Sequence, residues 1–231
     1  MTDTEARPEA APATPALEIA YRRVRQNVAA VLDAHPPAPR LVVPHCPEWT
    51  VEELVGHLVE VCARVRARVT GTETTSVTGQ GRTELLRTWE RLSGPVDEYL
   101  SGPWSIERGI MVMDAFTHEL DLRDALRVPP PADHPALPVA TMVVVAGLAQ
   151  SLNGRGLPAL RIETERGRWT AGEGEPATTV AGPWYDVYLS LAGRRTSAQI
   201  GALRWSSDPA PWLPALTWGP FTVPAERNAA H

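Results

Sequence analysis

The chain has 231 residues, of which 43% are hydrophobic and 21% charged, and its formal net charge is −5. This composition is ordinary for a globular protein long enough to form one large domain or two small ones. Because no basic run is present and no apolar run approaches the ~18 to 20 residues that span a bilayer, we expect neither nucleic-acid binding nor a membrane span.

The N-terminal segment 1–15 is rich in alanine and proline, carries acidic residues and has no apolar core. We therefore expect a disordered leader rather than a secretory signal. The two cysteines, Cys46 and Cys62, do not make a disulfide framework, so the sequence predicts a cytoplasmic protein. Arginine is abundant and lysine is absent, which indicates a GC-rich bacterial source.

Two helices are predicted in the first part of the chain, with a loop between them. Apolar residues recur every three and four positions over 16–34, as on one face of a helix. Five prolines interrupt residues 35–49, so an ordered loop is the most structure expected there. Thr50 and, three residues later, Glu53 form a capping box that predicts the start of the second helix.

Two further helices complete a predicted four-helix bundle over 16–127. One covers roughly 83–100, and the other begins after Ser105, which can cap it, and runs to about 126. Joined by modest loops, the four helices should pack with their polar site residues facing inward.

The proline-rich stretch 127–138 is the best candidate for a domain boundary. After it we expect a small α+β domain over 139–226, beginning with a buried helix at 139–152. Alternating residues on both sides of a glycine turn predict a hairpin starting at 160. A helix is expected between Pro183 and Gly193, and short strand-like pieces follow at 202–207 and 215–223.

Three side chains predict a metal site between two helices of the bundle. Asp114 and His118 are four residues apart and therefore share one helix face, and His57 lies beside the apolar stripe of the second helix. One carboxylate and two imidazoles leave room for a thiol or water, whereas structural zinc sites are closed by four protein ligands. This donor set is typical of a catalytic metal. Asp121 lies on the same helix face as His118.

Each of these residues also has a plainer interpretation. A single histidine beside an apolar stripe, such as His57, is more often a core or boundary residue than a ligand. Asp114 and His118 also have the spacing of an ordinary pair on a helix surface. Cys46 is expected to pack in its loop, with a role as fourth ligand as the lesser alternative.

Other polar and aromatic residues have both kinds of explanation. Arg194 and Arg195 could neutralise carbonyl groups at a helix C-terminus, or could reach the site and bind a substrate carboxylate. Trp49 flanks the predicted site and could line it. His45 and His134 lie beside prolines in loops, so we expect both to be solvated.

The turn before the second helix and the start of that helix carry a distinct pattern, made of Pro44, Cys46, Pro47, Trp49, Thr50, Leu54 and His57. This pattern resembles the opening motif of the mycothiol-dependent maleylpyruvate isomerase family. In the family's second motif, an acidic residue precedes a histidine by four residues, and an aspartate follows the histidine. Here these residues are Asp114, His118 and Asp121. The C-terminal part is similar to the family's sterol-carrier-like domain at Trp169, 180–182 and 191–194. The resemblance extends from about 17 to 224.

This resemblance implies a DinB-like four-helix bundle followed by a small sterol-carrier-like α+β domain. It also implies a divalent metal, usually zinc, held by His57, Asp114 and His118, and mycothiol as the thiol cofactor. One position departs from the pattern, because the family more often carries glutamate where this chain has Asp114. Aspartate is one methylene shorter, which affects the coordination geometry and the metal preference.

The chemistry expected from these groups is the attack of a metal-bound thiolate on a small electrophile. Asp121 can orient a ligand imidazole through its second ring nitrogen, and Arg194 or Arg195 can bind a substrate carboxylate. Trp49 is expected beside the cofactor. The reaction is then either cis–trans isomerisation of a maleylpyruvate-type substrate or transfer of the thiol sulfur.

Two other classes of protein remain as alternatives. A non-catalytic module would bind a metal or a lipid, and a regulator of the anti-sigma type would need paired cysteines near its histidine. Cys46 and Cys62 do not have that spacing. As partners we expect a small-molecule substrate and a low-molecular-weight thiol, with the chain as a monomer or homodimer.

Overall fold

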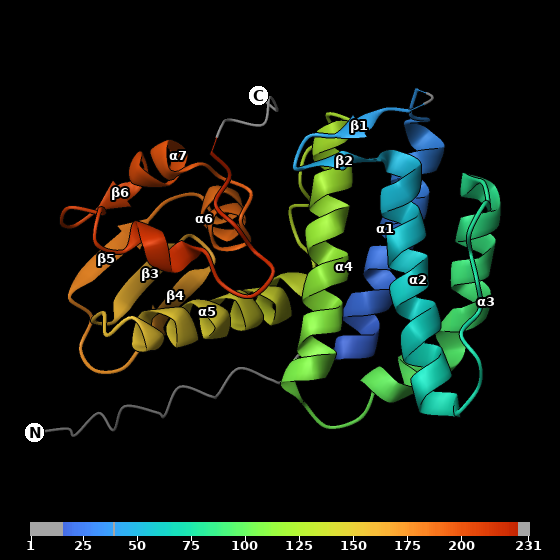
Figure 1. The fold of residues 1–231 in the computed structure, drawn as a ribbon, viewed down its shortest axis with the longest axis horizontal. Coiled ribbons are helices and arrows are strands. Elements are labelled where there is room, and N and C mark those ends of the chain that lie inside the picture. Colours follow the sequence, from blue (N-terminus) through green and yellow to red (C-terminus); the bar gives the residue numbers. More distant parts are fainter. Residues whose placement is uncertain (1–15, 39, 226–231) are drawn as a thin grey trace, which may run out of the picture.

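A computed structural model describes residues 16–38 and 40–225, so the leader predicted over 1–15 lies outside the described residues. The N-terminal half is helical and the C-terminal half combines helices with a small sheet (Figure 1), as the sequence predicts. The helices of the first half are α1 (Leu17–Ala34), α2 (Val51–Thr70), α3 (Arg82–Leu100) and α4 (Ile106–Ala125).

Capping groups explain where α2 and α4 begin. The hydroxyl of Thr50 accepts a hydrogen bond from the backbone N–H of Glu53, and the Glu53 carboxylate accepts one from the backbone N–H of Thr50. Ser105 accepts a hydrogen bond from the backbone N–H of Arg108 and so caps α4. Helix α2 ends where Gly71 adopts the left-handed conformation, with a φ of 67°.

The segment expected to be only a loop, 35–49, contains part of a small hairpin, and that expectation was wrong. Strands β1 (Val42–Val43) and β2 (Cys46–Thr50) pair in antiparallel fashion, with an irregularity in the register. Pro44 lies in the turn, and Pro47 lies in the irregular part of β2. Neither proline therefore has to donate a hydrogen bond to the partner strand. In Figure 1 the hairpin lies across one end of α2 and α4.

The C-terminal half contains a four-stranded sheet with the order β4-β3-β5-β6. Its strands are β3 (Leu160–Thr164), β4 (Gly167–Ala171), β5 (Thr178–Ala181) and β6 (Arg204–Trp205). Strand β3 forms the predicted hairpin with β4 and is parallel to β5, and β6 is antiparallel to β5. The helices here are α6 (Trp184–Leu191), α7 (Ser197–Gly201) and the 3₁₀ helix η1 (Leu213–Leu216).

Two details near the C-terminus differ from the sequence expectation. Pro183 is the residue before α6 rather than its first residue. The strand expected over 215–223 is absent from the described part of the chain, where η1 is followed by an isolated bridge between Trp218 and Phe221. Proline in the first turn of η1 fixes φ at a helical value and has no N–H to pair with a neighbouring strand.

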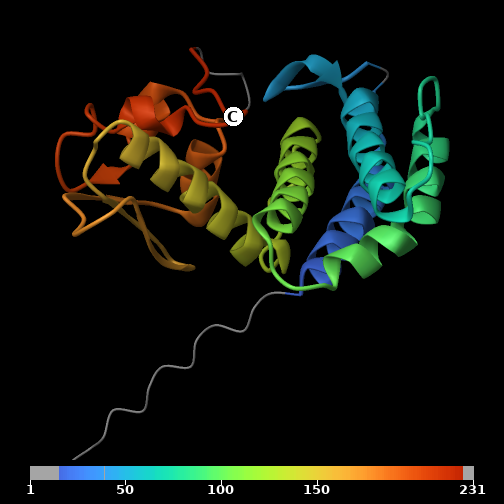
Figure 2. The same ribbon diagram turned by 60° about the horizontal axis from the view of Figure 1, so that its bottom comes forward.

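Helix α5 (Ala136–Gly154) joins the two halves. It packs against α1 and α4 of the first half and against β4, α6 and η1 of the second, and Figure 2 shows it leading from α4 to the sheet. By length and composition α5 could cross a membrane, so the expectation of no such segment was too strict. Its packing against both halves is that of a core helix. The domain limits 16–127 and 139–226 stay predictions.

A buried carboxylate ties α4 to its neighbours. The side chain of Glu119 is fully buried and accepts hydrogen bonds from Asn27 Nδ2 at 3.0 Å and from Arg123 Nε at 2.8 Å. His134 Nε2 lies 3.1 Å from the other carboxylate oxygen, and His134 Nδ1 accepts a hydrogen bond from the backbone N–H of Ala136. These contacts fix α4 against α1 and against the start of α5.

The prediction that His45 and His134 are solvated was wrong. Their side chains are only 5% and 1% exposed, respectively. His45 Nε2 lies 3.2 Å from Asp124 Oδ2, on the last turn of α4. Each histidine lies next to a buried or partly buried carboxylate of α4. The neighbouring prolines gave no indication of these contacts.

Candidate metal centre

Helices α2 and α4 bring His57, Asp114 and His118 together. His57 Nε2 lies 3.6 Å from Asp114 Oδ2, and His118 Nε2 lies 3.6 Å from Asp114 Oδ1. One ligand atom from each residue lies within 4.8 Å of the other two. The two α4 residues share a face because they are one helical turn apart, whereas the contact with His57 depends on how α2 packs against α4.

Two of these atoms lack the hydrogen bonds that burial demands. His57 Nε2 and Asp114 Oδ2 are inaccessible to solvent and have no hydrogen-bond partner among the described residues. A buried polar atom without a partner costs about 1–3 kcal/mol. Two ligands about 2.0–2.1 Å from one tetrahedral ion are about 3.4 Å apart, close to the separations seen here. The three residues therefore fit a divalent cation.

The ionisation of Asp114 suits such an ion. Burial opposes ionisation of Asp114, but the imidazole of His57, 3.6 Å away, and the charges of His118 and Arg194 outweigh it and hold the pKa of Asp114 below its usual value. Asp114 is therefore a carboxylate at neutral pH. An anionic oxygen between two imidazoles is a good ligand for zinc.

Asp121 orients the His118 ring, and its carboxylate is fully buried. Asp121 Oδ2 lies 3.0 Å from His118 Nδ1. When Nδ1 carries the proton and donates it to this oxygen, Nε2 is left with its lone pair facing Asp114. Burial lowers the pKa of His118, but the hydrogen bonds with Asp121 and Cys46 and the charges of Asp121 and Asp114 outweigh it and raise the pKa to about 9. The ring is therefore protonated at neutral pH in the metal-free protein, and a cation that binds Nε2 would displace that proton.

Arg194 holds Asp121 from the C-terminal half. Its Nε donates to Asp121 Oδ1 at 3.2 Å, its Nη2 donates to Oδ2 at 2.8 Å, and its Nη1 donates to the carbonyl of Ala192. Burial opposes ionisation of Asp121, but the charge of Arg194 and the hydrogen bonds of His118 and Arg194 bring the pKa of Asp121 far below its usual value. A short polar chain therefore runs from Arg194 through Asp121 to the candidate ligand.

The two adjacent arginines have different surroundings. Arg195 donates through Nε and Nη2 to Asp186 Oδ1 and does not line the cleft described below, whereas Arg194 does. Of the two arginines proposed from the sequence to bind a substrate carboxylate, only Arg194 is placed to do so by this geometry.

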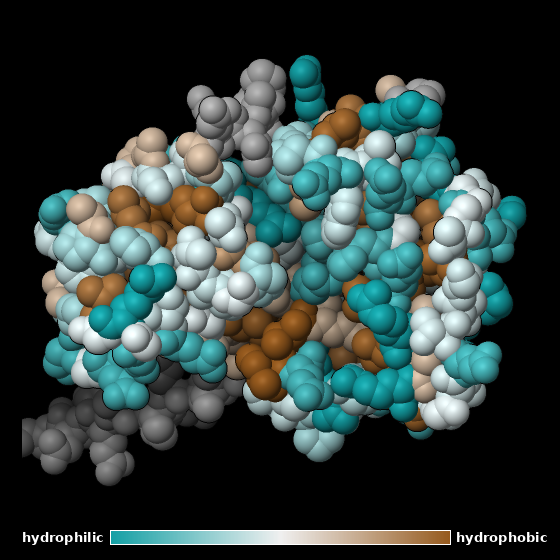
Figure 3. Space-filling view, in the orientation of Figure 1, coloured by the Kyte–Doolittle hydropathy of each residue, from teal (hydrophilic) through white to brown (hydrophobic). Residues whose placement is uncertain are grey.

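The three candidate ligands lie in a cleft of about 940 Å³, which we call the metal cleft. Its walls come from α2, α4, β2 and residues 220–221, and they include the apolar side chains Val61, Val65, Ile110, Met111, Met113 and Phe221. In Figure 3 hydrophobic surface gathers at the junction of the two halves, beside α4. The Trp49 ring is centred 4.8 Å from the His57 ring and 5.6 Å from the His118 ring, so Trp49 forms a wall of the site.

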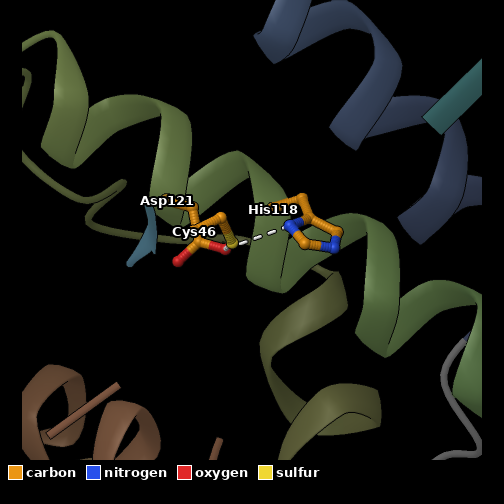
Figure 4. A group of neighbouring side chains, drawn as sticks. All are labelled: Cys46, His118 and Asp121. Carbon is orange, nitrogen blue, oxygen red and sulfur yellow. Dashed lines mark hydrogen bonds and ion pairs between the residues drawn. The ribbon is translucent and has the colours of Figure 1, made fainter. Parts of the chain in front are cut away.

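Cys46 belongs to the same cluster, although loop packing was the main expectation for it and a role as fourth ligand the lesser one. Its Sγ lies 3.8 Å from Asp121 Oδ2 and 4.0 Å from Arg194 Nη2. Figure 4 shows Cys46 facing His118 and Asp121 of α4. Cys46, His118 and Asp121 make a second possible ligand set. Both oxygens of Asp121 are already hydrogen bonded, however, whereas His57 and Asp114 keep unpaired atoms.

No protein-family model and no curated protein matches the chain. Two solved structures are similar to it. One is the mycothiol-dependent maleylpyruvate isomerase, with a TM-score of 0.49, and the other is a variant of that enzyme with one histidine replaced by alanine, with a TM-score of 0.47. Each is 16% identical in sequence, and each alignment covers 83% of this chain and 90% of the other.

Proposed function

We propose that this protein is a thiol-dependent metalloenzyme, in which His57, Asp114 and His118 hold a divalent cation, with zinc as the first candidate. The observation that carries the proposal is the pair of buried, unpaired ligand atoms, His57 Nε2 and Asp114 Oδ2, beside His118 Nε2. The donor set of two imidazoles and one carboxylate leaves a position for an external ligand, as in catalytic zinc sites.

The thiol proposed is mycothiol, on the basis of the motif resemblance that runs from Pro44 to His57. A divalent cation in this site would bind the thiol sulfur and remove its proton at neutral pH, which supplies a thiolate nucleophile. The cleft of about 940 Å³ is large enough for a thiol cofactor together with a small substrate. Trp49 offers the cofactor a flat apolar wall next to the imidazoles.

The chain's own groups would position the ligands and the substrate. Asp121 holds the His118 ring with its Nε2 next to Asp114, and Arg194 holds Asp121. Arginine has five N–H donors, and the bonds to Asp121, Ala192 and Cys46 engage four of them. The remaining Nη1–H of Arg194, which lines the cleft, is available to a substrate carboxylate.

The reaction proposed is addition of the thiolate to a small electrophilic carboxylate. If the substrate has a conjugated cis double bond, sulfur adds to one carbon, the resulting single bond rotates, and the thiolate leaves, so that only the geometry changes. If the substrate carries a leaving group instead, that group departs and the thioether is the product. Isomerase and S-transferase activities therefore share one site and one first step.

Metal content and thiol affinity test the proposal together. The purified protein should contain about one zinc per chain, and calorimetry should show mycothiol binding to the zinc-loaded protein. His57→Ala should lose both properties, whereas His35→Ala, at an exposed histidine before the hairpin, should keep both. A wild-type protein that binds neither zinc nor mycothiol would refute the assignment and favour a non-catalytic module.

A further inference from the structure

A second cavity of about 650 Å³ lies in the C-terminal half, and it shares no lining residue with the metal cleft. Ile162 and Thr164 lie two residues apart on β3 and so point to the same face of the sheet. Residues of α5 and α6 close this face, and the segment before α5 and Arg23 of α1 complete the rim. We call this space the sheet cavity. Cavities of roughly 300 to 1,000 Å³ hold small organic ligands.

The walls of the sheet cavity are mainly aromatic and aliphatic: Leu137, Ile162, Trp169, Trp184, Val187 and Leu191. Trp169 and Trp184 are only half-buried, so each keeps ring surface available for a ligand. The hydroxyl of Tyr188 is engaged with Thr117 Oγ1 at 2.7 Å, which leaves its ring as the part that faces the cavity. Such walls suit an apolar molecular body.

The charged groups at the rim add up to a net positive charge. Arg166 donates to Asp133 at 3.0 Å and to the carbonyl of Ala132, so its charge is partly neutralised. His134 also lines the cavity, but its Nε2 lies 3.1 Å from Glu119 Oε2 and its Nδ1 accepts a hydrogen bond from a backbone N–H. Arg23 is exposed on α1 and makes no hydrogen bond or ion pair within 16–38 and 40–225.

We propose that the sheet cavity binds a small amphipathic carboxylate, with its apolar body between the tryptophans and its carboxylate at Arg23. A guanidinium group matches a carboxylate in shape and charge, and Arg23 is the rim cation that still lacks such a partner in the described chain. The apolar walls supply affinity for the body of the ligand, and Arg23 selects an anionic head group. This role does not depend on the metal centre.

Calorimetry with three probes of equal chain length tests the charge selection. Octanoate should bind at one site, and about tenfold more tightly than 1-octanol or octyltrimethylammonium. Arg23→Gln should weaken octanoate binding about tenfold and leave 1-octanol unchanged. Arg22→Gln is the matched control, because Arg22 is also exposed on α1 but lies near Asp97 and outside the cavity. Equal binding of the three probes, or equal effects of the two substitutions, would overturn the proposal.

Two further variants locate the bound probe. Octanoate should change the tryptophan emission, and the double variant Trp169→Phe/Trp184→Phe should lose most of that change while it still binds octanoate. His57→Ala should bind octanoate as tightly as the wild type, because the metal cleft is a separate site. Loss of octanoate binding in His57→Ala, or an emission change that survives in the double variant, would place the probe elsewhere and refute the proposal.

Discussion

Arg194 and Asp121 form a forked ion pair across the two halves of the molecule, with Nη2 2.8 Å from Oδ2 and Nε 3.2 Å from Oδ1. The Asp121 side chain is 0% exposed and that of Arg194 is 10% exposed. The pair therefore couples the packing of the C-terminal half to the orientation of His118, because the same carboxylate accepts from His118 Nδ1. Damage to the pair should affect both stability and the site.

Breaking this pair from one side should be strongly destabilising. Arg194→Gln leaves a buried carboxylate without its cation, and we expect a loss of about 3–5 kcal/mol in the free energy of unfolding. The double variant Asp121→Asn/Arg194→Gln should lose less than the sum of the two single variants, since neither charge remains unpaired. Urea denaturation of the four proteins measures this. Strictly additive losses would show that the two residues do not act as a pair.

The His118–Asp121 interaction should make stability depend on pH in the metal-free protein. The folded pKa of His118 is about 9, above its ordinary value of 6.5, so folding favours the protonated ring. The resulting stabilisation, about 3 kcal/mol, is fully present below pH ~6.5 and is lost as pH rises toward 9. The difference in unfolding free energy between wild type and His118→Gln should therefore shrink over this range. With chelator present, urea denaturation at several pH values measures it, and a constant difference would contradict it.

Substitution of Cys46 should distinguish the two possible ligand sets. Cys46→Ser should change zinc affinity by less than about threefold, because Asp121 is occupied by Arg194 and His118 and is a poor ligand. His57→Gln should lower zinc affinity by about 100-fold or more, since it removes a donor atom. Competition with a chromogenic chelator gives both affinities. The opposite ranking would assign the metal to Cys46, His118 and Asp121.

Glu119 should be essential for stability although it lies outside the metal cleft. Glu119→Ala leaves Arg123 and His134 without their shared buried acceptor, and we expect a loss of about 3–5 kcal/mol. The control is Glu60→Ala on α2, where the Glu60 side chain is 50% exposed and the expected change is within about 0.5 kcal/mol. Thermal and urea denaturation measure both variants. A loss in Glu119→Ala no larger than that of the control would contradict the role given to the network.

The helices of the first half could be predicted closely because their signals are local. Thr50 and Ser105 cap α2 and α4 at the positions expected, and the apolar spacing of 16–34 matches α1. The hairpin β1–β2 could not be predicted in this way. The paired segment contains prolines, which argue against a strand. Only the register shows that these prolines lie where no backbone hydrogen bond to the partner strand is needed.

The burial of His45 and His134 could not be predicted from local signals either. Their carboxylate partners, Asp124 and Glu119, belong to another element and are distant in the sequence. Arg194 and Arg195 could not be separated from sequence either. Adjacent residues after a helix end point in different directions, and the surrounding fold decides that Arg194 meets Asp121 while Arg195 meets Asp186.

The sequence alone determined that Asp114, His118 and Asp121 share one face of a helix, because helical periodicity is a local property of the chain. Only the tertiary structure decided that His57 comes within 3.6 Å of Asp114, that Cys46 joins the cluster, and that Arg194 completes it from the other half. These contacts depend on how whole elements pack, and packing is the combined result of many buried side chains distributed along the chain.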